Sequence, residues 1–340
     1  MARIDTLTNF LTDVASAIKE KTGKTDAITP ANFDTEIESI QSGGDASIED
    51  GLIEGTLTEY SNDRITKVKS YGFHQQLNLV SISLPNVTTI GDYAMQSCPL
   101  TSGMYFPEVT QIGQFTFYYG KFKSIDLPKL TSTGQKAFAS CRSLEILYLP
   151  ELVSEGSQLC ASCSSLTTVC FPKITSISAM CVYNISSVKH IDFSSATSIT
   201  SSFTGCSSLE MLILRSDIIC TLAEGYALSS SKINSGEGYI YVPSNLVDEY
   251  KEATNWVAVS EQFIPINVDI TVTVGETYTP TYEGATSWDL TKLTSDDVAT
   301  IDTSTGIVIL NTKGRVLIRA FDIDGNIVHV EYLTIEEVTE

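Results

Sequence analysis

The chain has 340 residues, enough for two or three domains, and 42% of them are hydrophobic against 18% charged, which is typical of a folded protein and excludes a disordered one. Acidic residues outnumber basic ones 41 to 21, for a net charge of -20. Phosphate backbones and anionic lipid surfaces would repel such a chain, so we expect no nucleic-acid partner and no membrane insertion.

The first elements in the chain are two short helices. Apolar residues recur at steps of three and four between Ile4 and Ile18, and Thr29-Pro30 is typical of an N-cap followed by proline at the first helical position. The pattern predicts a helical hairpin over residues 1–44, ending in a Gly- and Ser-containing linker. It either docks on other proteins or a second copy, giving a homo-oligomer, or folds against its own chain.

The same segment bears on localisation. Residues 4–21 carry several charges and show no continuous apolar core of a secretory signal, and no apolar run reaches the ~20 residues of a membrane helix. We therefore expect that the protein is made and kept in the cytoplasm, or that it leaves the cytoplasm by a route other than standard secretion.

A repeat of 21 or 22 residues dominates the middle of the chain. Seven segments share the order apolar, two variable, apolar, one variable, apolar, and a period this regular predicts a solenoid, here over residues 45–264. An irregular entry repeat over residues 52–78 is expected at its open end. The last apolar residues of the seven segments are Leu84, Phe106, Leu127, Leu149, Phe171, Phe193 and Leu214.

Each repeat continues with a second set of matched positions. A proline follows the strand in five repeats, but Ser194 and Arg215 take its place in the last two. An isoleucine then recurs at one slot, and a glycine follows it where no side chain fits or φ is positive. These glycines are Gly91, Gly113, Gly134 and Gly156.

The eight cysteines follow the repeat. Four of them share one slot that Ile185 fills in another repeat, so the slot is small and apolar. We therefore expect reduced, buried cysteines rather than disulfides or a zinc site, and we expect no cofactor.

These motifs resemble the BspA-type (Treponema-type) leucine-rich repeat. The segment Lys136-Ala-Phe-Ala-Ser-Cys-Arg-Ser-Leu144 carries the resemblance most clearly, and residues 239–256 resemble the closing unit of such arrays, a strand followed by a capping helix.

The variable positions of the repeat strands are the candidate binding residues. Tyrosines beside carboxylates can stack on sugar rings and accept hydrogen bonds from hydroxyls. For any single one of these residues, an ordinary solvated strand face is the favoured interpretation, and His190 is expected to be exposed. The candidates are Tyr105, Asp126, Tyr148, His190 and Asp192.

Residues 265–340 no longer follow the repeat pattern. Short alternating strands with turn signals every 8–12 residues predict a β-sandwich, and the motifs resemble the bacterial immunoglobulin-like domain of group 2. Asp322-Ile-Asp-Gly-Asn326 resembles the start of a calcium loop, but it lacks the glycine and glutamate of an EF-hand, so a β-hairpin with an Asp-Gly turn is expected. The fold class is thus multidomain and mainly β.

No catalytic arrangement is visible, because the three histidines lie in different regions and no nucleotide or metalloprotease motif is present. We expect a non-enzymatic adhesion protein that binds a host-surface protein or glycan. Residues 18–30 resemble the start of phage structural proteins, which implies a bacteriophage virion appendage such as a tail fibre, docked on other virion proteins through the N-terminal helices. The alternative is a bacterial cell-surface adhesin.

Overall fold

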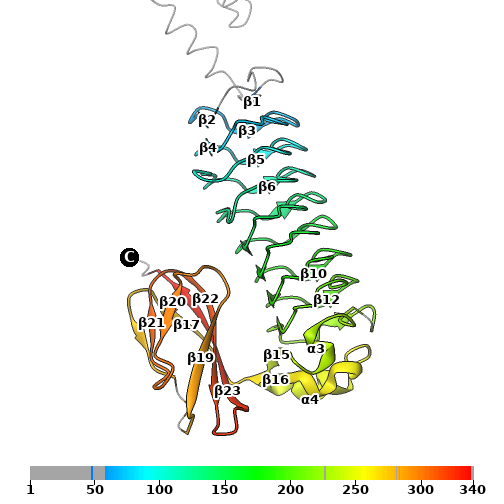
Figure 1. Ribbon diagram of the computed structural model, residues 1–340, viewed down its shortest axis with the longest axis vertical. Helices are drawn as coiled ribbons and strands as arrows, with labels where there is room; N and C mark the ends of the chain where they lie inside the picture. Colours follow the sequence, from blue (N-terminus) through cyan, green and yellow to red (C-terminus); the bar gives the residue numbers. More distant parts are fainter. Residues whose placement is uncertain (1–46, 49–57, 226, 281, 283, 338–340) are drawn as a thin grey trace, which may run out of the picture.

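A computed structural model describes residues 47–48, 58–225, 227–280, 282 and 284–337. The helical hairpin expected over residues 1–44 lies outside these ranges. Figure 1 shows a long stack of coils ending in a small helical cap, with a second, two-sheet domain beside the last coils. Within the described ranges, none of the helices is long and apolar enough to cross a membrane.

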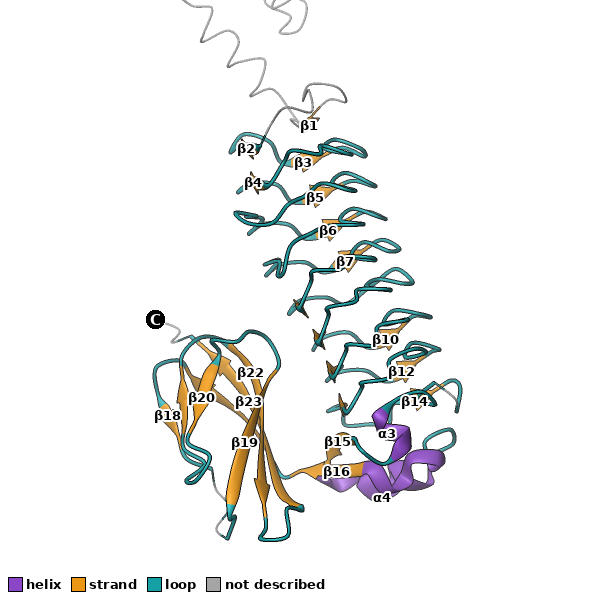
Figure 2. Ribbon diagram, in the orientation of Figure 1, coloured by secondary structure: helices purple, strands orange, loops and turns teal. Residues whose placement is uncertain are grey.

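Most coils contribute short strands at two matched positions, and these strands pair in parallel with those of neighbouring coils (Figure 2). The strands of the predicted repeat motif, here called the face strands, form a two-stranded and a six-stranded sheet. The corner strands precede the glycine slot and form a five-stranded and a three-stranded sheet. The face strands are β2 (Glu59–Ser61), β4 (Ser81–Ser83), β8 (Ile146–Tyr148), β9 (Thr168–Cys170), β11 (His190–Asp192), β13 (Met211–Ile213), β15 (Tyr239–Pro243) and β16 (Phe263–Ile266). The corner strands are β1 (Ser47–Ile48), β3 (Lys67–Val68), β5 (Thr89–Ile90), β6 (Gln111–Ile112), β7 (Ser132–Thr133), β10 (Ser176–Ile177), β12 (Ser198–Ile199) and β14 (Thr221–Leu222).

The core of the solenoid is one continuous apolar cluster made of matched positions from successive coils. Phe117 and Phe138, one coil apart, stack with ring centroids 5.5 Å apart. All eight cysteines are buried and free, which confirms the expected reduced cysteines. Because each buried apolar side chain contributes ~1.5–3 kcal/mol and must have a neighbouring coil to pack on, a single coil would not fold alone.

The glycine corners allow the coils to approach closely. A Cβ on Gly134 would lie 2.2 Å from the backbone nitrogen of Gln114, and one on Gly91 would lie 2.4 Å from that of Ser70. Their φ angles are not positive, so close approach is the reason for glycine here. The left-handed residues are instead side-chain-bearing ones in the following turn, such as Tyr93 with φ 57°.

The last coil is closed by the helices α3 (Lys232–Ser235) and α4 (Val247–Glu252), with the 3-10 helices η2 (Ser244–Leu246) and η3 (Val257–Gln262). Trp256 is fully buried and its indole Nε1 donates to the carbonyl of Cys220 at 2.7 Å. The backbone N–H of Cys220 donates to the Tyr250 hydroxyl at 2.8 Å. The predicted strand-and-helix cap is therefore confirmed.

The C-terminal domain has two sheets that enclose one apolar core around Trp288. The hairpin between the two longest strands turns at Asp322, whose Oδ1 accepts the backbone N–H of Asp324 and Asn326, as expected for the Asp-Gly turn. One sheet has the order β17 (Val268–Thr273), β23 (Ile327–Glu336), β22 (Gly314–Phe321), β19 (Ser287–Lys292), and the other β18 (Thr277–Tyr278), β21 (Val308–Leu310), β20 (Ala299–Ile301).

Candidate functional site on the face strands

The surface of the face strands is open over the earlier coils. Tyr105 bridges to Ser83 of β4 in the preceding coil, and 55% of its surface is exposed. Asp126, one coil further, is also exposed. Beside them Lys123 and Glu145 form an exposed ion pair of 2.8 Å. Two of the five candidate binding residues are therefore accessible to a ligand.

The other three candidates lie where the C-terminal domain covers the face strands. Asp192 is fully buried, and Tyr148 and His190 are half-buried. The expectation that His190 is exposed is wrong, because the C-terminal domain folds back against the coil that carries it. The five candidates thus do not form one open surface.

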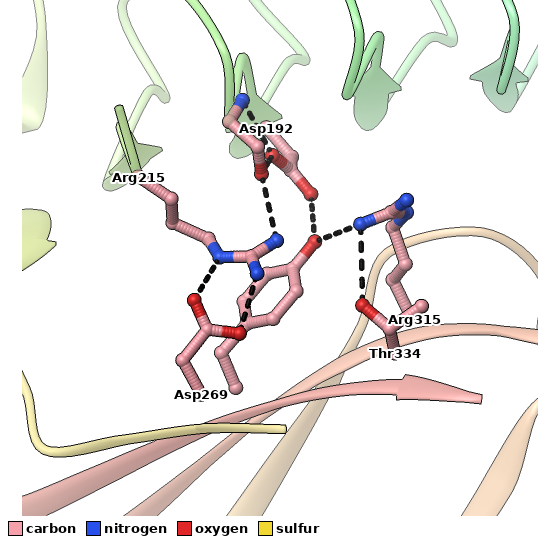
Figure 3. Close-up of polar contacts among 7 residues, drawn as sticks. Asp192, Arg215, Asp269, Arg315 and Thr334 are labelled. Atoms are coloured by element: carbon pink, nitrogen blue, oxygen red, sulfur yellow. Dashed lines mark hydrogen bonds and ion pairs between the residues drawn. The ribbon is translucent and has the colours of Figure 1, made fainter. Parts of the chain in front are cut away.

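Asp192 is the centre of a polar junction between solenoid and C-terminal domain (Figure 3). Its Oδ2 accepts a 2.5 Å hydrogen bond from the hydroxyl of Tyr332 on β23. That hydroxyl in turn accepts from Nη1 of Arg315 on β22 at 3.2 Å. Burial raises the pKa of Tyr332 well above its usual value, so the hydroxyl keeps the proton that it donates.

Arg215 closes the same junction from the solenoid side. Its Nε donates to Asp269 Oδ2 at 2.7 Å, and its Nη2 donates to the other oxygen of that carboxylate. Its guanidinium carbon lies 3.8 Å from the centre of the Tyr332 ring, and its Nη1 donates to Ser194 Oγ. Such two-point ion pairing with ring stacking is a geometry that arginine provides and lysine does not.

Apolar side chains complete the contact. Met211 and Ile213 of β13 join Tyr241 of β15 in a buried cluster with residues of the C-terminal domain. Nη1 of Arg319 on β22 donates to the Tyr241 hydroxyl at 3.3 Å. The domain is therefore held by both desolvated polar pairs and apolar packing. Ile266 of β16 joins from the solenoid side, and the C-terminal domain contributes Leu293, Leu317, Val330 and Tyr332.

His190 titrates abnormally in this contact. Burial lowers the pKa of its imidazole to about 4, although the nearby carboxylate of Glu210, 3.6 Å away, opposes the shift. The positive charges of Arg319 and Lys189 act in the same direction as burial. The histidine is therefore neutral at pH 7.

Two pockets flank the junction. One of about 450 Å³ is lined by Lys173, Arg215 and Arg315 together with serine hydroxyls and Asp217. The other, of about 250 Å³, lies beside Tyr148 and shares Lys173 and Arg315 with the first. Carboxylates offset the charge of these cations. Lys173 pairs with Glu151 and Arg215 with Asp269, and the buried carboxylate of Asp192 is linked to Arg315 through the Tyr332 hydroxyl.

The cysteine thiols of the solenoid lie in its core. Burial raises the pKa of Cys98 and of Cys206 to about 12, so these thiols are protonated and unreactive at neutral pH. In the part of the chain that the structure describes, no three histidine, cysteine, aspartate or glutamate side chains are grouped to hold a metal ion. Burial likewise raises the pKa of Tyr148 to about 12.

Sequence reasoning missed Arg215, Arg315 and Tyr332 as functional residues of the junction. A signal for two junction residues was present: Ser194 and Arg215 stand where the other repeats have proline. Proline has no N–H, whereas the N–H and Oγ of Ser194 both donate to Asp192. The two departures from the repeat therefore mark the coils on which the C-terminal domain docks.

Known structures resemble this chain in their repeats. A leucine-rich repeat protein of T. pallidum is 23% identical over 43% of this chain and 72% of its own, with a TM-score of 0.40. One from Bacteroides ovatus is 18% identical over 66% and 70%, with a TM-score of 0.36. A leucine rich cell surface protein of Faecalibacterium prausnitzii is 17% identical over 60% and 82%, with a TM-score of 0.26. These likenesses concern the fold alone.

The sequence itself identifies the family. No curated protein matches the chain. The family model for the BspA type leucine rich repeat region matches in six copies, over residues 57–160 and 156–248. Because this match spans more than half of the chain, and the coils, corners and buried cysteines follow the repeat, the protein belongs to the BspA-type leucine-rich repeat family.

Proposed function

We propose that this protein is a non-enzymatic, adhesion-type recognition protein that binds a host-surface protein or glycan through the open part of its face strands. The observation that carries the proposal is that one surface of the solenoid is covered over its last coils and open over its earlier coils. The C-terminal domain covers His190 and Asp192, whereas Tyr105 and Asp126 remain in solvent on a rigid scaffold. Solenoids present extended surfaces of this kind for binding.

The exposed residues suit a polar partner. The Tyr105 ring offers apolar area with few rotatable bonds, and Asp126 accepts hydrogen bonds from hydroxyl or amide groups. The ion pair of Lys123 and Glu145 leaves the neighbouring surface without excess charge of one sign. A protein surface or a glycan meets these requirements, whereas an apolar ligand does not.

The bacterial cell surface is the location that we favour for this recognition. The repeats that match the family suit a bacterial adhesin as well as a virion appendage. One of the supports of the phage hypothesis is the sequence of residues 18–30, which lie outside the described residues. We further propose that the C-terminal two-sheet domain is of the group 2 immunoglobulin-like type and fixes the orientation of the solenoid.

The test is attachment of the purified full-length protein to cultured epithelial cells, measured by flow cytometry. Tyr105→Ala and Asp126→Asn are each expected to weaken attachment at least fivefold without lowering the melting temperature, because both side chains are exposed. Tyr282→Ala, which removes a partly exposed tyrosine from the C-terminal domain, is the matched control and should attach normally.

Equal attachment by all three variants would contradict the proposal. Antibody labelling of intact producing bacteria, and separately of phage particles released from them, tests the location. Label on particles but not on cells would reverse our preference in favour of the virion.

A further inference from the structure

The larger of the two pockets at the junction lies between walls from both domains. Its volume of about 450 Å³ falls within the range of roughly 300–1,000 Å³ that is typical of small-molecule sites. Arg315 of β22 and Thr334 of β23, which pair directly across the sheet, form the wall of the C-terminal domain. The opposite wall is the turn that follows the face strand in three successive coils. Its polar residues are Lys173, Ser194, Ser195, Arg215, Ser216 and Asp217.

The polar character of this pocket comes from the two coils that lack proline. Pro172 follows β9, as proline follows the strand in earlier coils, whereas Ser194 and Arg215 hold the equivalent positions in the next two. Among the described residues that line the pocket, Pro172 is the one apolar residue. A ligand would therefore meet hydroxyl, ammonium and guanidinium groups here.

Three arginines lie where the two domains meet, and one of them has no carboxylate partner. Arg215 and Arg319 each donate to both oxygens of an aspartate. Arg315 forms no ion pair within the part of the chain that the structure describes. Its Nη1 donates instead to the Tyr332 hydroxyl at 3.2 Å and to Thr334 Oγ1 at 3.4 Å, which are neutral groups.

Asp192 does not contact this guanidinium. Its Oδ2 accepts from the Tyr332 hydroxyl and its Oδ1 from the N–H and Oγ of Ser194, so the tyrosine hydroxyl stands between the carboxylate and Arg315. The hydroxyl of Tyr148, beside Arg315, is neutral as well. Figure 3 shows the remaining nitrogens of Arg315 turned away from Asp192. Because a desolvated charge is stabilised by a counter-charge, a carboxylate from a ligand would be favoured beside Arg315.

The smaller pocket, of about 250 Å³, continues past Arg315. It shares Lys173, Arg315 and Thr334 with the larger pocket and adds the ammonium group of Lys313. Because the chain has a net charge of -20, an anionic ligand can bind only where cations gather in this way. The carboxylates that line this pocket are Glu151, Glu336 and Glu337.

These carboxylates limit the charge that the ligand can carry. Cations and carboxylates are nearly balanced around the two pockets, so a group with a single negative charge fits better than a phosphate group, which carries about -1.5 to -2 at pH 7. A guanidinium and an ammonium group side by side are good partners for a carboxylate.

We infer that these two pockets, together called the junction site here, bind a sugar chain that carries carboxylates, such as one with uronic or sialic acid units. The carboxylate would accept hydrogen bonds from Arg315 and Lys173. Sugar hydroxyls both donate and accept, so the half-buried hydroxyls of Ser195 and Ser216 suit them. An acidic peptide fits less well, because peptide side chains are recognised mainly through apolar pockets.

The experiment titrates the full-length protein by isothermal titration calorimetry with two acidic sugars, sialyllactose and trigalacturonate. Lactose and maltotriose are their neutral counterparts. At least one acidic sugar should bind at least tenfold more tightly than its counterpart. Inorganic sulfate and hexaglutamate, titrated at the same ionic strength, represent a general anion site and a peptide site, and each should bind at least tenfold more weakly than that sugar.

Two variants assign the binding to the junction site. Lys173→Gln and Arg315→Gln should each weaken binding of the acidic sugar at least fivefold. The Lys173 side chain is 51% exposed, so the melting temperature of Lys173→Gln should not change. Arg315→Gln also loses the contact with Tyr332, so Lys173→Gln decides the result if Arg315→Gln is unstable.

Lys129→Gln is the matched control. Lys129 also follows the proline, two coils earlier, and its Nζ contacts both carboxylate oxygens of Glu108 as that of Lys173 contacts those of Glu151. Lys129 lines neither pocket, so its variant should bind the acidic sugar as the unmodified protein does.

Four results would each overturn the inference: equal affinity for acidic and neutral sugars, tighter binding of hexaglutamate, equally tight binding of sulfate, or equal effects of Lys173→Gln and Lys129→Gln. The inference goes beyond the proposed attachment through the open face strands, because Tyr105 and Asp126 do not line the junction site. Cell attachment that depends on Tyr105 would therefore stand even if the junction site failed this test.

Discussion

At the scale of single residues, Asp192 shows how the C-terminal domain changes the role of a surface position. Its carboxylate would face solvent on an isolated solenoid, but here it accepts hydrogen bonds from Ser194 and from Tyr332, 140 positions away in the chain. Each of these hydroxyls accepts in turn from an arginine, Arg215 or Arg315. A buried charge is tolerated only when its hydrogen-bonding capacity is met in this way.

His190 belongs to the same contact and predicts a pH dependence of stability. Its pKa is about 4 in the folded protein against about 6.5 in the unfolded chain, so the unfolded chain binds the proton more tightly. Stability is therefore fully present above pH 6.5 and falls as the pH decreases toward 4. The linkage relation gives a loss of about 2 kcal/mol between pH 7 and pH 5.

Urea unfolding at both pH values measures this loss. His190→Gln cannot take up a proton, so its stability should change less between pH 7 and pH 5 than that of the unmodified protein, by about that amount. Equal changes in the two proteins would show that His190 does not titrate in this range.

At the scale of elements, the coil corner illustrates what the repeat requires. The sequence allowed two explanations for the recurring glycine, a close approach of backbones or a positive φ angle. The structure supports the close approach of neighbouring coils. Left-handed backbone occurs two residues later, at Tyr93 and its equivalents, where the sequence contained no glycine to suggest it. Local pattern therefore located the corner, whereas its backbone conformation depended on packing between coils.

Gly134→Ala tests the corner. Its Cβ would lie 2.2 Å from the Gln114 backbone nitrogen, so adjacent coils must separate, and we expect a loss of about 3 kcal/mol or more, seen as a lower urea midpoint. Gly325→Ala is the control, since Gly325 has φ 83° but nothing within 4 Å of an added Cβ, and only about 1 kcal/mol should be lost. Similar losses in both variants would contradict close approach as the reason for glycine at the corner.

At the scale of the whole molecule, the C-terminal domain divides the face strands into an open and a covered part. The cover depends on contacts between the last coils and β17, β22 and β23, including a two-point ion pair, a stacked guanidinium and an apolar cluster. These contacts join segments that lie far apart in the chain. Within the repeat, only Ser194 and Arg215, which replace the usual proline, indicate them.

Arg215→Ala should loosen this docking while both parts stay folded. It removes the pair with Asp269 and the stacking on Tyr332, so we expect amide hydrogen exchange in β11 and β23 to accelerate by at least tenfold. Lys129→Ala removes an exposed pair with Glu108, whose side chains are 53% and 44% exposed, and should leave exchange in these strands unchanged. Exchange unaffected by Arg215→Ala would mean that the apolar cluster holds the domain alone.

The sequence by itself determined the coil period, the apolar core columns, the buried free cysteines, the cap and the hairpin near the C-terminus. These follow from contacts between neighbouring coils or neighbouring strands, which short-range patterns encode directly. Only the tertiary structure decided that Tyr105 and Asp126 stay open while Tyr148, His190 and Asp192 are covered. That outcome depends on complementary charge and shape between two domains, and such a match exists only once both surfaces are folded.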